Sequence, residues 1–130
     1  MKVAVSSRGT ERMSVVDPRF GRALYFVTVD TESDEVEGIE NPGALAGTGA
    51  GVAAAQLIAD AGAEAVITSA LGPHAWAALK SGGIQVFEAG RGTVDAMVQL
   101  LLQGGLAPLE EPNADLKAGA ARFGQSPDVK

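Results

Sequence analysis

AVITSALGPHAWAALKSGGIQVFE, residues 65–88, is the stretch of sequence that decides the fold of this chain. Residues 65–68 form a short, almost continuously apolar run, which is typical of a strand buried on both faces. Pro73 suits the first turn of a helix that we expect over residues 74–81, and residues 84–88 then predict a second strand. Because a helix joins the two strands, we expect them to lie parallel in one sheet with a right-handed crossover.

Strands and helices continue to alternate on both sides of this stretch. Thr93 can cap a helix over residues 94–103. Before residue 65, the pattern predicts a strand, a hairpin and an alanine-rich helix, at residues 2–6, 24–30 with 35–41, and 52–61. This order predicts an α/β domain with a five-stranded mixed sheet, helices on both faces, and the first, fourth and fifth strands as parallel neighbours.

The length of 130 residues fits one domain that closes its own hydrophobic core. We expect this domain at residues 1–106. Residues 107–130 combine proline, glycine and charge with little periodicity, which predicts a flexible C-terminal tail. No apolar run approaches the ~20 residues of a membrane span, and the first residues form a strand pattern rather than a signal peptide. A cytoplasmic protein is therefore expected.

The formal net charge of −6 argues against nucleic acid or an anionic membrane as the main partner. However, residues 1–22 carry five basic and two acidic residues, for a net charge of +3, while residues 23–130 stand at −9. The four arginines of the N-terminal loop could surround a small anion: Arg8, Arg12, Arg19 and Arg22. Alternatively, this is a solubilising loop whose arginines pair with nearby carboxylates.

The string DPRFGR, residues 17–22, is the most unusual local sequence. Arg19 and Arg22 could present parallel guanidinium groups to an anion, with the adjacent proline and glycine shaping the bend. In the alternative interpretation, Arg19 pairs with Asp17 while Phe20 packs into the sheet. Both interpretations remain open at this point.

A glycine-rich stretch precedes the helix expected at 52–61. Gly47, Gly49 and Gly51 would let an anion approach the backbone N–H groups at the start of that helix. A dinucleotide fingerprint counted from Gly47 meets Val52 at its last glycine, and the Gly-Lys-Ser/Thr of a phosphate-binding loop is missing, so nucleotide binding is disfavoured. The stretch is then a site for a small anion or a cluster, or an ordinary loop.

His74 is the only histidine and Met13 offers a thioether, and the chain contains no cysteine. His74 follows a buried strand, at the edge where ligands bind in α/β sheets, so His74 and Met13 are the candidate metal ligands. The alternatives are a surface histidine and a packing methionine. The lack of cysteine excludes disulfides, thiolate metal sites and thiol nucleophiles.

The sequence shows no convincing arrangement of catalytic residues. The serines have no Gly-x-Ser-x-Gly setting, and the carboxylates gather on the expected hairpin, where solvation accounts for them. The strands at residues 2–6 and 65–68 contain no carboxylate for a metal-dependent nuclease. We therefore expect a binding protein rather than an enzyme.

Five features taken together resemble one family. They are the string at 17–22, the hairpin end Ile39-Glu40-Asn41-Pro42, the glycine-rich entry at 47–51, residues 65–68 with Gly72-Pro73, and Gly92-Thr93-Val94. In this order they resemble the dinitrogenase iron-molybdenum cofactor biosynthesis family, which includes nitrogenase cofactor carriers and the orange protein of sulfate-reducing bacteria. The resemblance covers residues 1 to about 105.

The resemblance implies a ribonuclease-H-like fold and the noncovalent binding or carrying of an anionic metal-sulfur cluster, in cluster assembly or delivery with other cytoplasmic proteins. The cluster would contain molybdenum with copper or iron, as a molybdenum-copper sulfide or an iron-molybdenum cofactor. The residues themselves, rather than the resemblance, suggest that the cluster would lie at the strand ends, among the four loop arginines, the amides of residues 47–51 and His74. The alternative is a metal-free regulatory or scaffolding module that binds a protein partner through the hairpin edge.

Overall fold

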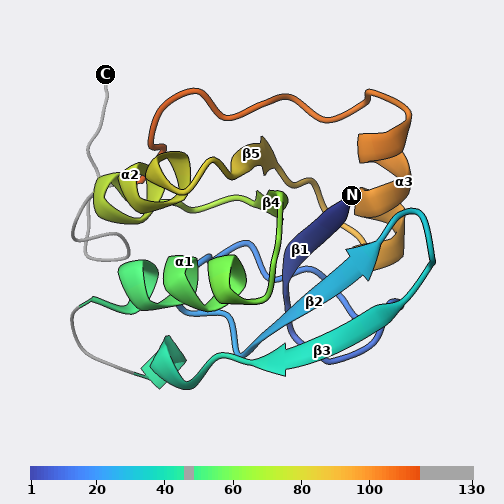
Figure 1. The fold of residues 1–130 in the computed structure, drawn as a ribbon, viewed down its shortest axis with the longest axis horizontal. Coiled ribbons are helices and arrows are strands. Elements are labelled where there is room, and N and C mark those ends of the chain that lie inside the picture. The colour runs from blue at the N-terminus through green and yellow to red at the C-terminus, as the bar shows by residue number, and fades with distance from the viewer. Residues whose placement is uncertain (46–48, 115–130) are drawn as a thin grey trace.

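The computed structural model describes residues 1–45 and 49–114. Its elements in chain order are β1 (Lys2–Ser7), β2 (Tyr25–Asp30), β3 (Val36–Glu40), the 3-10 helix η1 (Pro42–Leu45), α1 (Ala50–Asp60), β4 (Ala65–Thr68), α2 (Pro73–Ser81), β5 (Gln85–Glu88) and α3 (Val94–Leu102). Figure 1 shows the β2–β3 hairpin at the lower right of the molecule, α3 above the hairpin turn, and α1 and α2 on the left.

The five strands form one mixed sheet in the order β3-β2-β1-β4-β5. β1 is antiparallel to β2, with Val5 opposite Val27, and parallel to β4, with Val5 opposite Ile67. β4 and β5 are also parallel, with Val66 opposite Val86. The expected α/β fold, its ribonuclease-H-like strand order and the parallel arrangement of the first, fourth and fifth strands are confirmed.

Helices cover both faces of the sheet, as expected. On one face, Ile58 of α1 and Leu79 of α2 pack with Phe26 and Val66 from the strands. On the other face, α3 packs through Val94, Met97 and Val98 against a second core that includes Val3, Val5 and Ile67. The central strands β1 and β4 therefore contribute alternate residues to the cores on the two faces of the sheet. This explains why residues 65–68 of β4 are all buried.

The helix boundaries follow local chemistry. The Thr93 hydroxyl accepts a hydrogen bond of 3.1 Å from the Ala96 N–H and caps α3 as expected. α1 begins at Ala50, two residues earlier than the pattern predicts, because Gly49 has a φ of 79° and turns the chain sharply into the helix. The turn η1 lies in a stretch for which the sequence predicts no helix.

The segment after α3 is held against the sheet. The Glu88 N–H donates to the Ala107 carbonyl at 2.9 Å, and the Leu109 N–H donates to the Val86 carbonyl at 2.8 Å. Further on, the Asn113 side chain accepts a hydrogen bond of 2.9 Å from the Leu71 N–H. In the expected tail, residues 107–109 thus pair with the edge of β5 and residues 113–114 bond to Leu71, while residues 115–130 lie outside the described residues.

None of the helices described here has both the length and the apolar character needed to cross a membrane.

Candidate functional site

The candidate site lies at the carboxyl ends of β1 and β4, which are parallel neighbours. The segment of residues 17–23, here called the arginine loop, crosses this edge. The Pro18 carbonyl accepts hydrogen bonds from the N–H groups of Ser69 (3.2 Å) and Ala70 (2.6 Å), and the Phe20 N–H donates to the Ala70 carbonyl at 3.2 Å. The arginine loop therefore continues the sheet beyond the end of β4.

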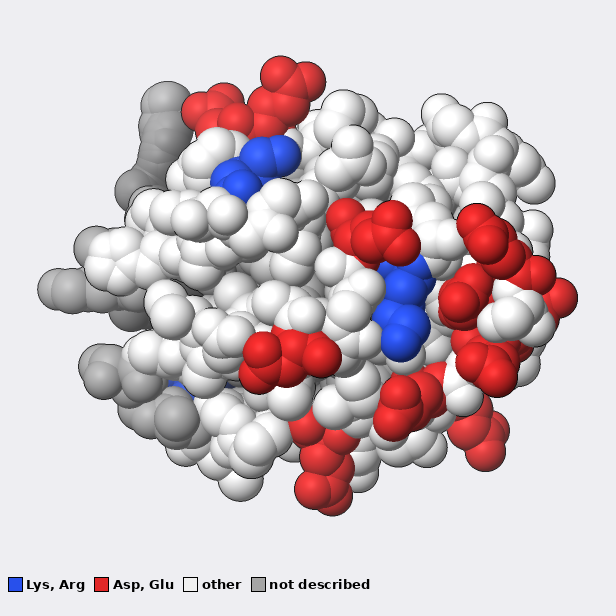
Figure 2. Space-filling view, viewed as in Figure 1, with Lys and Arg blue, Asp and Glu red and all other residues white. Residues whose placement is uncertain are grey.

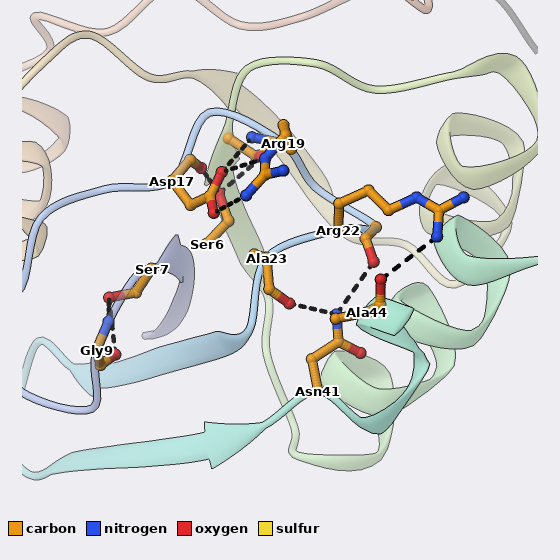
Figure 3. A network of polar contacts seen from close by, with 11 residues as sticks. Ser6, Ser7, Gly9, Asp17, Arg19, Arg22, Ala23, Asn41 and Ala44 are labelled. Carbon is orange, nitrogen blue, oxygen red and sulfur yellow. Dashed lines mark hydrogen bonds and ion pairs between the residues drawn. The ribbon is translucent and has the colours of Figure 1, made fainter. Parts of the chain in front are cut away.

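Two buried hydroxyl groups fix the start of the arginine loop (Figure 3). The Ser6 hydroxyl of β1 donates to the Asp17 carbonyl at 2.6 Å, and it lies 2.8 Å from the Thr68 hydroxyl of β4. Because Ser6 uses its hydrogen for the carbonyl, the Thr68 hydroxyl is the donor of the second bond. The hydroxyl groups at the ends of the two buried strands thus bond to each other, and the Ser6 hydroxyl holds the start of the arginine loop.

Asp17 and Arg19 form a local pair inside this loop. The Asp17 carboxylate accepts hydrogen bonds from the Arg19 backbone N–H (2.9 Å), from Nε (3.1 Å) and from Nη2 (2.9 Å). Asp17 is buried, whereas the Arg19 side chain is 58% exposed. Together with the buried ring of Phe20, this confirms the interpretation in which Arg19 pairs with Asp17 and Phe20 packs into the sheet.

Burial acts to raise the pKa of the Asp17 carboxyl, but its hydrogen bonds and charge interaction with Arg19, with a further contribution from the charge of Arg8, outweigh burial and hold that pKa below its usual value. The ionised carboxylate therefore stabilises the fold at pH values above the ordinary pKa of 3.8. This stabilisation is lost as the pH falls through the lowered pKa of the folded protein.

We expect the substitution Asp17→Asn to make the free energy of unfolding less dependent on pH in the acid range. Between about pH 5 and pH 2, the free energy of unfolding should fall less in the variant than in the parent chain, because the variant has no carboxylate to protonate at this position. At neutral pH the variant should lose about 1–2 kcal/mol, since hydrogen bonds to a charged group weaken while Arg19 stays half in solvent. Urea unfolding at several pH values measures both effects, and parallel pH profiles would contradict the assignment.

Arg22 and Asn41 tie the arginine loop to the turn that follows β3 (Figure 3). Asn41 is buried, and its side-chain amide donates to the carbonyls of Gly21 (3.2 Å) and Ala23 (2.8 Å). Arg22 Nη1 donates to the Ala44 carbonyl of η1 at 3.3 Å. The sequence marks Asn41 only as the end of a strand, so its role in holding the loop is seen from the structure alone.

The starts of α1 and α2 meet the arginine loop at the same edge. A Cβ atom built on Gly21 would lie 2.8 Å from the Gly51 nitrogen, and one built on Gly51 would lie 2.9 Å from the Ala75 Cβ. His74 is the second residue of α2, beside Ala75, and is exposed. Arg19, Arg22, Gly49, Gly51 and His74 are thus brought to one edge, while Gly47 lies outside the described residues.

Arg12 and Met13 lie elsewhere, at the start of α3. Arg12 Nε is 2.6 Å from the Asp95 carboxylate, and Arg12 Nη1 is 3.7 Å from that of Asp34. The structure does not bring Arg12 together with Arg19 and Arg22, because these two carboxylates hold its guanidinium. Met13 follows in the same turn and is 65% exposed. α3 covers the opposite face of the sheet from α2, so the packing does not join Met13 to His74.

Arg8 is exposed at the start of the N-terminal loop. Its backbone N–H donates to the Val15 carbonyl at 2.9 Å, and its charge acts on the pKa of Asp17. Arg8 therefore adds positive charge near the arginine loop, and none of the ion pairs found within residues 1–45 and 49–114 includes it.

The donors at this edge suit an anion better than a bare metal ion. Within residues 1–45 and 49–114, no three His, Cys, Asp or Glu residues are grouped so that they could hold a metal ion. The edge instead offers guanidinium groups, a helix start with glycines and one imidazole.

The family model described as dinitrogenase iron-molybdenum cofactor matches residues 1–104. This chain belongs to that family. The matched region spans β1 through α3, and thus includes every element that positions the arginine loop.

Among the solved structures, this member of the dinitrogenase cofactor family resembles the apo form of the orange protein from Desulfovibrio gigas, with a TM-score of 0.83 and 38% identity over 86% of this chain and 95% of the other. A candidate NifB protein from Thermotoga gives a TM-score of 0.73 and 37% identity, over 82% and 91% of the two chains. The uncharacterized protein MJ0580 of Methanocaldococcus jannaschii is 35% identical over 98 residues, which are 73% of this chain and 83% of that protein. The family description connects the chain with the iron-molybdenum cofactor of dinitrogenase.

Proposed function

We propose that this chain binds an anionic metal-sulfur cluster noncovalently at the carboxyl edge of the sheet, and carries it as cargo during cluster assembly or delivery. The observation that carries the proposal is the meeting of the arginine loop with the starts of α1 and α2, through the close approaches of Gly21 to Gly51 and of Gly51 to Ala75. Family membership supports the same class of ligand.

Arg19 remains able to bind an anion although it is paired. It donates to Asp17 through Nε and Nη2, so the N–H groups of Nη1 are not used by that carboxylate. Holding the guanidinium in one orientation also lowers the entropy lost when a ligand binds. Asp17 thus acts as the residue that orients Arg19, and the exposed outer side of the guanidinium faces solvent where a cluster can approach.

The chemistry of the edge supports a cluster that brings its own sulfides. The chain has no cysteine, so protein thiolates cannot complete the coordination of any metal. Guanidinium groups and backbone N–H groups donate hydrogen bonds to anionic sulfides, and the His74 imidazole can add one metal ligand. We propose a cluster that contains molybdenum with copper or iron, and other proteins of cytoplasmic cluster assembly as the partners.

The test is a titration of the metal-free full chain with tetrathiomolybdate and copper under anaerobic conditions, followed by visible absorption. We expect new absorption bands in the parent chain and affinity lowered about 10- to 100-fold in an Arg19→Ala, Arg22→Ala double variant, because two charge-assisted hydrogen-bonding groups are removed. Elemental analysis of the protein isolated anaerobically from its host then identifies molybdenum, copper or iron.

A double variant with Lys2→Ala and Lys80→Ala is the matched control. It removes the same charge at the opposite end of β1 and at the C-terminal end of α2, and should bind as the parent chain does. The Lys2 ammonium donates to the Ala61 carbonyl at 3.0 Å, so a thermal melt must show that the control is folded. Absent absorption changes, or equal affinities in both double variants, would count against the proposal.

A further inference from the structure

β3 forms an open edge of the sheet. In the described part of the chain it pairs with β2 alone, and four of its five residues are exposed. An edge strand presents unpaired N–H and C=O groups on its outer side, to which another extended chain can add by backbone hydrogen bonds. The opposite edge differs, because residues 107–109 pair with β5.

The open edge is strongly acidic. Residues 30–40 contain six carboxylates and no Lys or Arg: Asp30, Glu32, Asp34, Glu35, Glu37 and Glu40. Among the described ion pairs, the N-terminal ammonium lies 3.5 Å from Glu32, and Arg12 reaches Asp34 at 3.7 Å. No described ion pair reaches Glu35, Glu37 or Glu40. Figure 2 shows the acidic side chains gathered on the side of the molecule where Figure 1 places the hairpin.

The negative charge of the β3 edge determines which kind of strand can pair with it. A second copy of the chain pairing through its own β3 would place carboxylates opposite carboxylates, which destabilises a strand pair. A segment that carries basic side chains would instead form favourable cross-strand pairs. The edge therefore excludes its own copy and favours a cationic partner.

The spacing of the carboxylates also indicates where the basic side chains of a partner segment would lie. Glu35 and Glu37 are two residues apart and so point to the same face of the sheet. On that face an open groove lies between the hairpin and the start of β1, lined by Lys2, Thr28, Asp30, Glu35, Val36 and Glu37. A strand added beside β3 would direct alternate side chains toward this groove, within reach of both glutamates.

We propose that β3 is a docking edge for an extended segment of a partner protein that carries Lys or Arg at alternate positions. The added strand gains its affinity from backbone hydrogen bonds, and the carboxylates beside the groove select its charge pattern. The docking edge is separate from the arginine loop, since it uses the outer edge of the hairpin rather than the carboxyl ends of β1 and β4. A partner can therefore dock while the cluster site stays accessible.

The test uses a dye-labelled synthetic peptide with Lys at alternate positions between Thr and Val residues, and the metal-free full chain, in a fluorescence anisotropy titration at physiological salt. We expect a Glu35→Gln, Glu37→Gln double variant to bind about tenfold more weakly, because two cross-strand charge pairs are lost. A Glu110→Gln, Glu111→Gln double variant makes the same change of charge at exposed residues after α3 and should bind as the parent chain does.

A second peptide separates strand addition from simple charge attraction. N-methylation of alternate backbone amides keeps the charges but removes hydrogen-bond donors, so this peptide should bind at least about tenfold more weakly. Equal binding of the two peptides, equal binding by both double variants, or no binding of the first peptide would overturn the proposal. Loss of binding in the Arg19→Ala, Arg22→Ala variant would place the peptide at the cluster site and would also overturn it, while leaving the proposed cluster function intact.

Discussion

Replacing Phe20 by alanine is expected to lower the free energy of unfolding by about 3–5 kcal/mol, which is the cost of removing a fully buried aromatic ring. Phe20 is 1% exposed, and its ring centroid lies 5.3 Å from that of Phe26 at an interplanar angle of 59°. Such tilted ring pairs add to the stabilisation from burial. Urea unfolding followed by circular dichroism measures the loss.

The same substitution should also weaken cluster binding. Phe20 stands between Arg19 and Gly21, and its ring is the buried anchor of the arginine loop in the core under α1 and α2. Without this anchor the two loop arginines lose their fixed positions, so the tetrathiomolybdate and copper titration should show reduced affinity in variant protein that is still folded.

Leu24→Ala serves as the control for Phe20→Ala. Leu24 directly follows the arginine loop but is 50% exposed, so its truncation should cost no more than about 1 kcal/mol. Phe20→Leu should retain most of the stability, because it keeps an apolar side chain in the core. A loss below about 1 kcal/mol in Phe20→Ala, or equal losses in Phe20→Ala and Leu24→Ala, would show that Phe20 does not anchor the loop.

The sheet and its helices could be predicted from the sequence because their signals are local. Residues 65–68 are predicted and observed as a strand with the same bounds, since four successive apolar or small residues between turns fit only a doubly buried strand here. Thr93 and Pro73 mark two helix starts by their own capping and backbone preferences. The order of these elements then limits the topology to a few arrangements.

The candidate site could be predicted only in part, because its contacts join residues far apart in the chain. Asp17 and Arg19 are two residues apart, and their pairing is among the alternatives that the string at 17–22 raises. Arg12 and Asp95 are 83 residues apart, so nothing in the local sequence reveals that this arginine is held at the start of α3. The bond between Ser6 and Thr68 depends on the register of two strands, 62 residues apart.

The acidic hairpin relates the uneven charge of the sequence to the positions of two candidate binding surfaces in the structure. Six of the fourteen carboxylates in residues 23–130 lie in residues 30–40, which contain no Lys or Arg. In the structure they gather at the open edge beside β3, whereas the arginine loop lies at the carboxyl ends of β1 and β4. The charge asymmetry of the sequence thus becomes a spatial separation between a site for anions and an edge for cations.

The substitution Gly21→Ala is expected to lower the free energy of unfolding by about 1–3 kcal/mol, the usual cost of overpacking. The added Cβ would lie 2.8 Å from the nitrogen and 3.0 Å from the Cα of Gly51, and these backbone atoms cannot move aside as a flexible side chain would. Relief of the clash requires the arginine loop and the start of α1 to separate. Differential scanning calorimetry should therefore show a lower Tm, and cluster affinity should fall as well, because the loop arginines move away from the helix start.

Gly90→Ala is the matched control for this clash. A Cβ atom on Gly90 would meet nothing within 4 Å, and Gly90 does not have a positive φ, so the same methyl group should leave the Tm and the cluster affinity unchanged. If Gly21→Ala melts and binds as Gly90→Ala does, the close approach of the arginine loop to α1 does not position the site. If Gly21→Ala instead retains its Tm but loses affinity, the loop has moved without cost to the core, and the spacing between Gly21 and Gly51 determines binding alone.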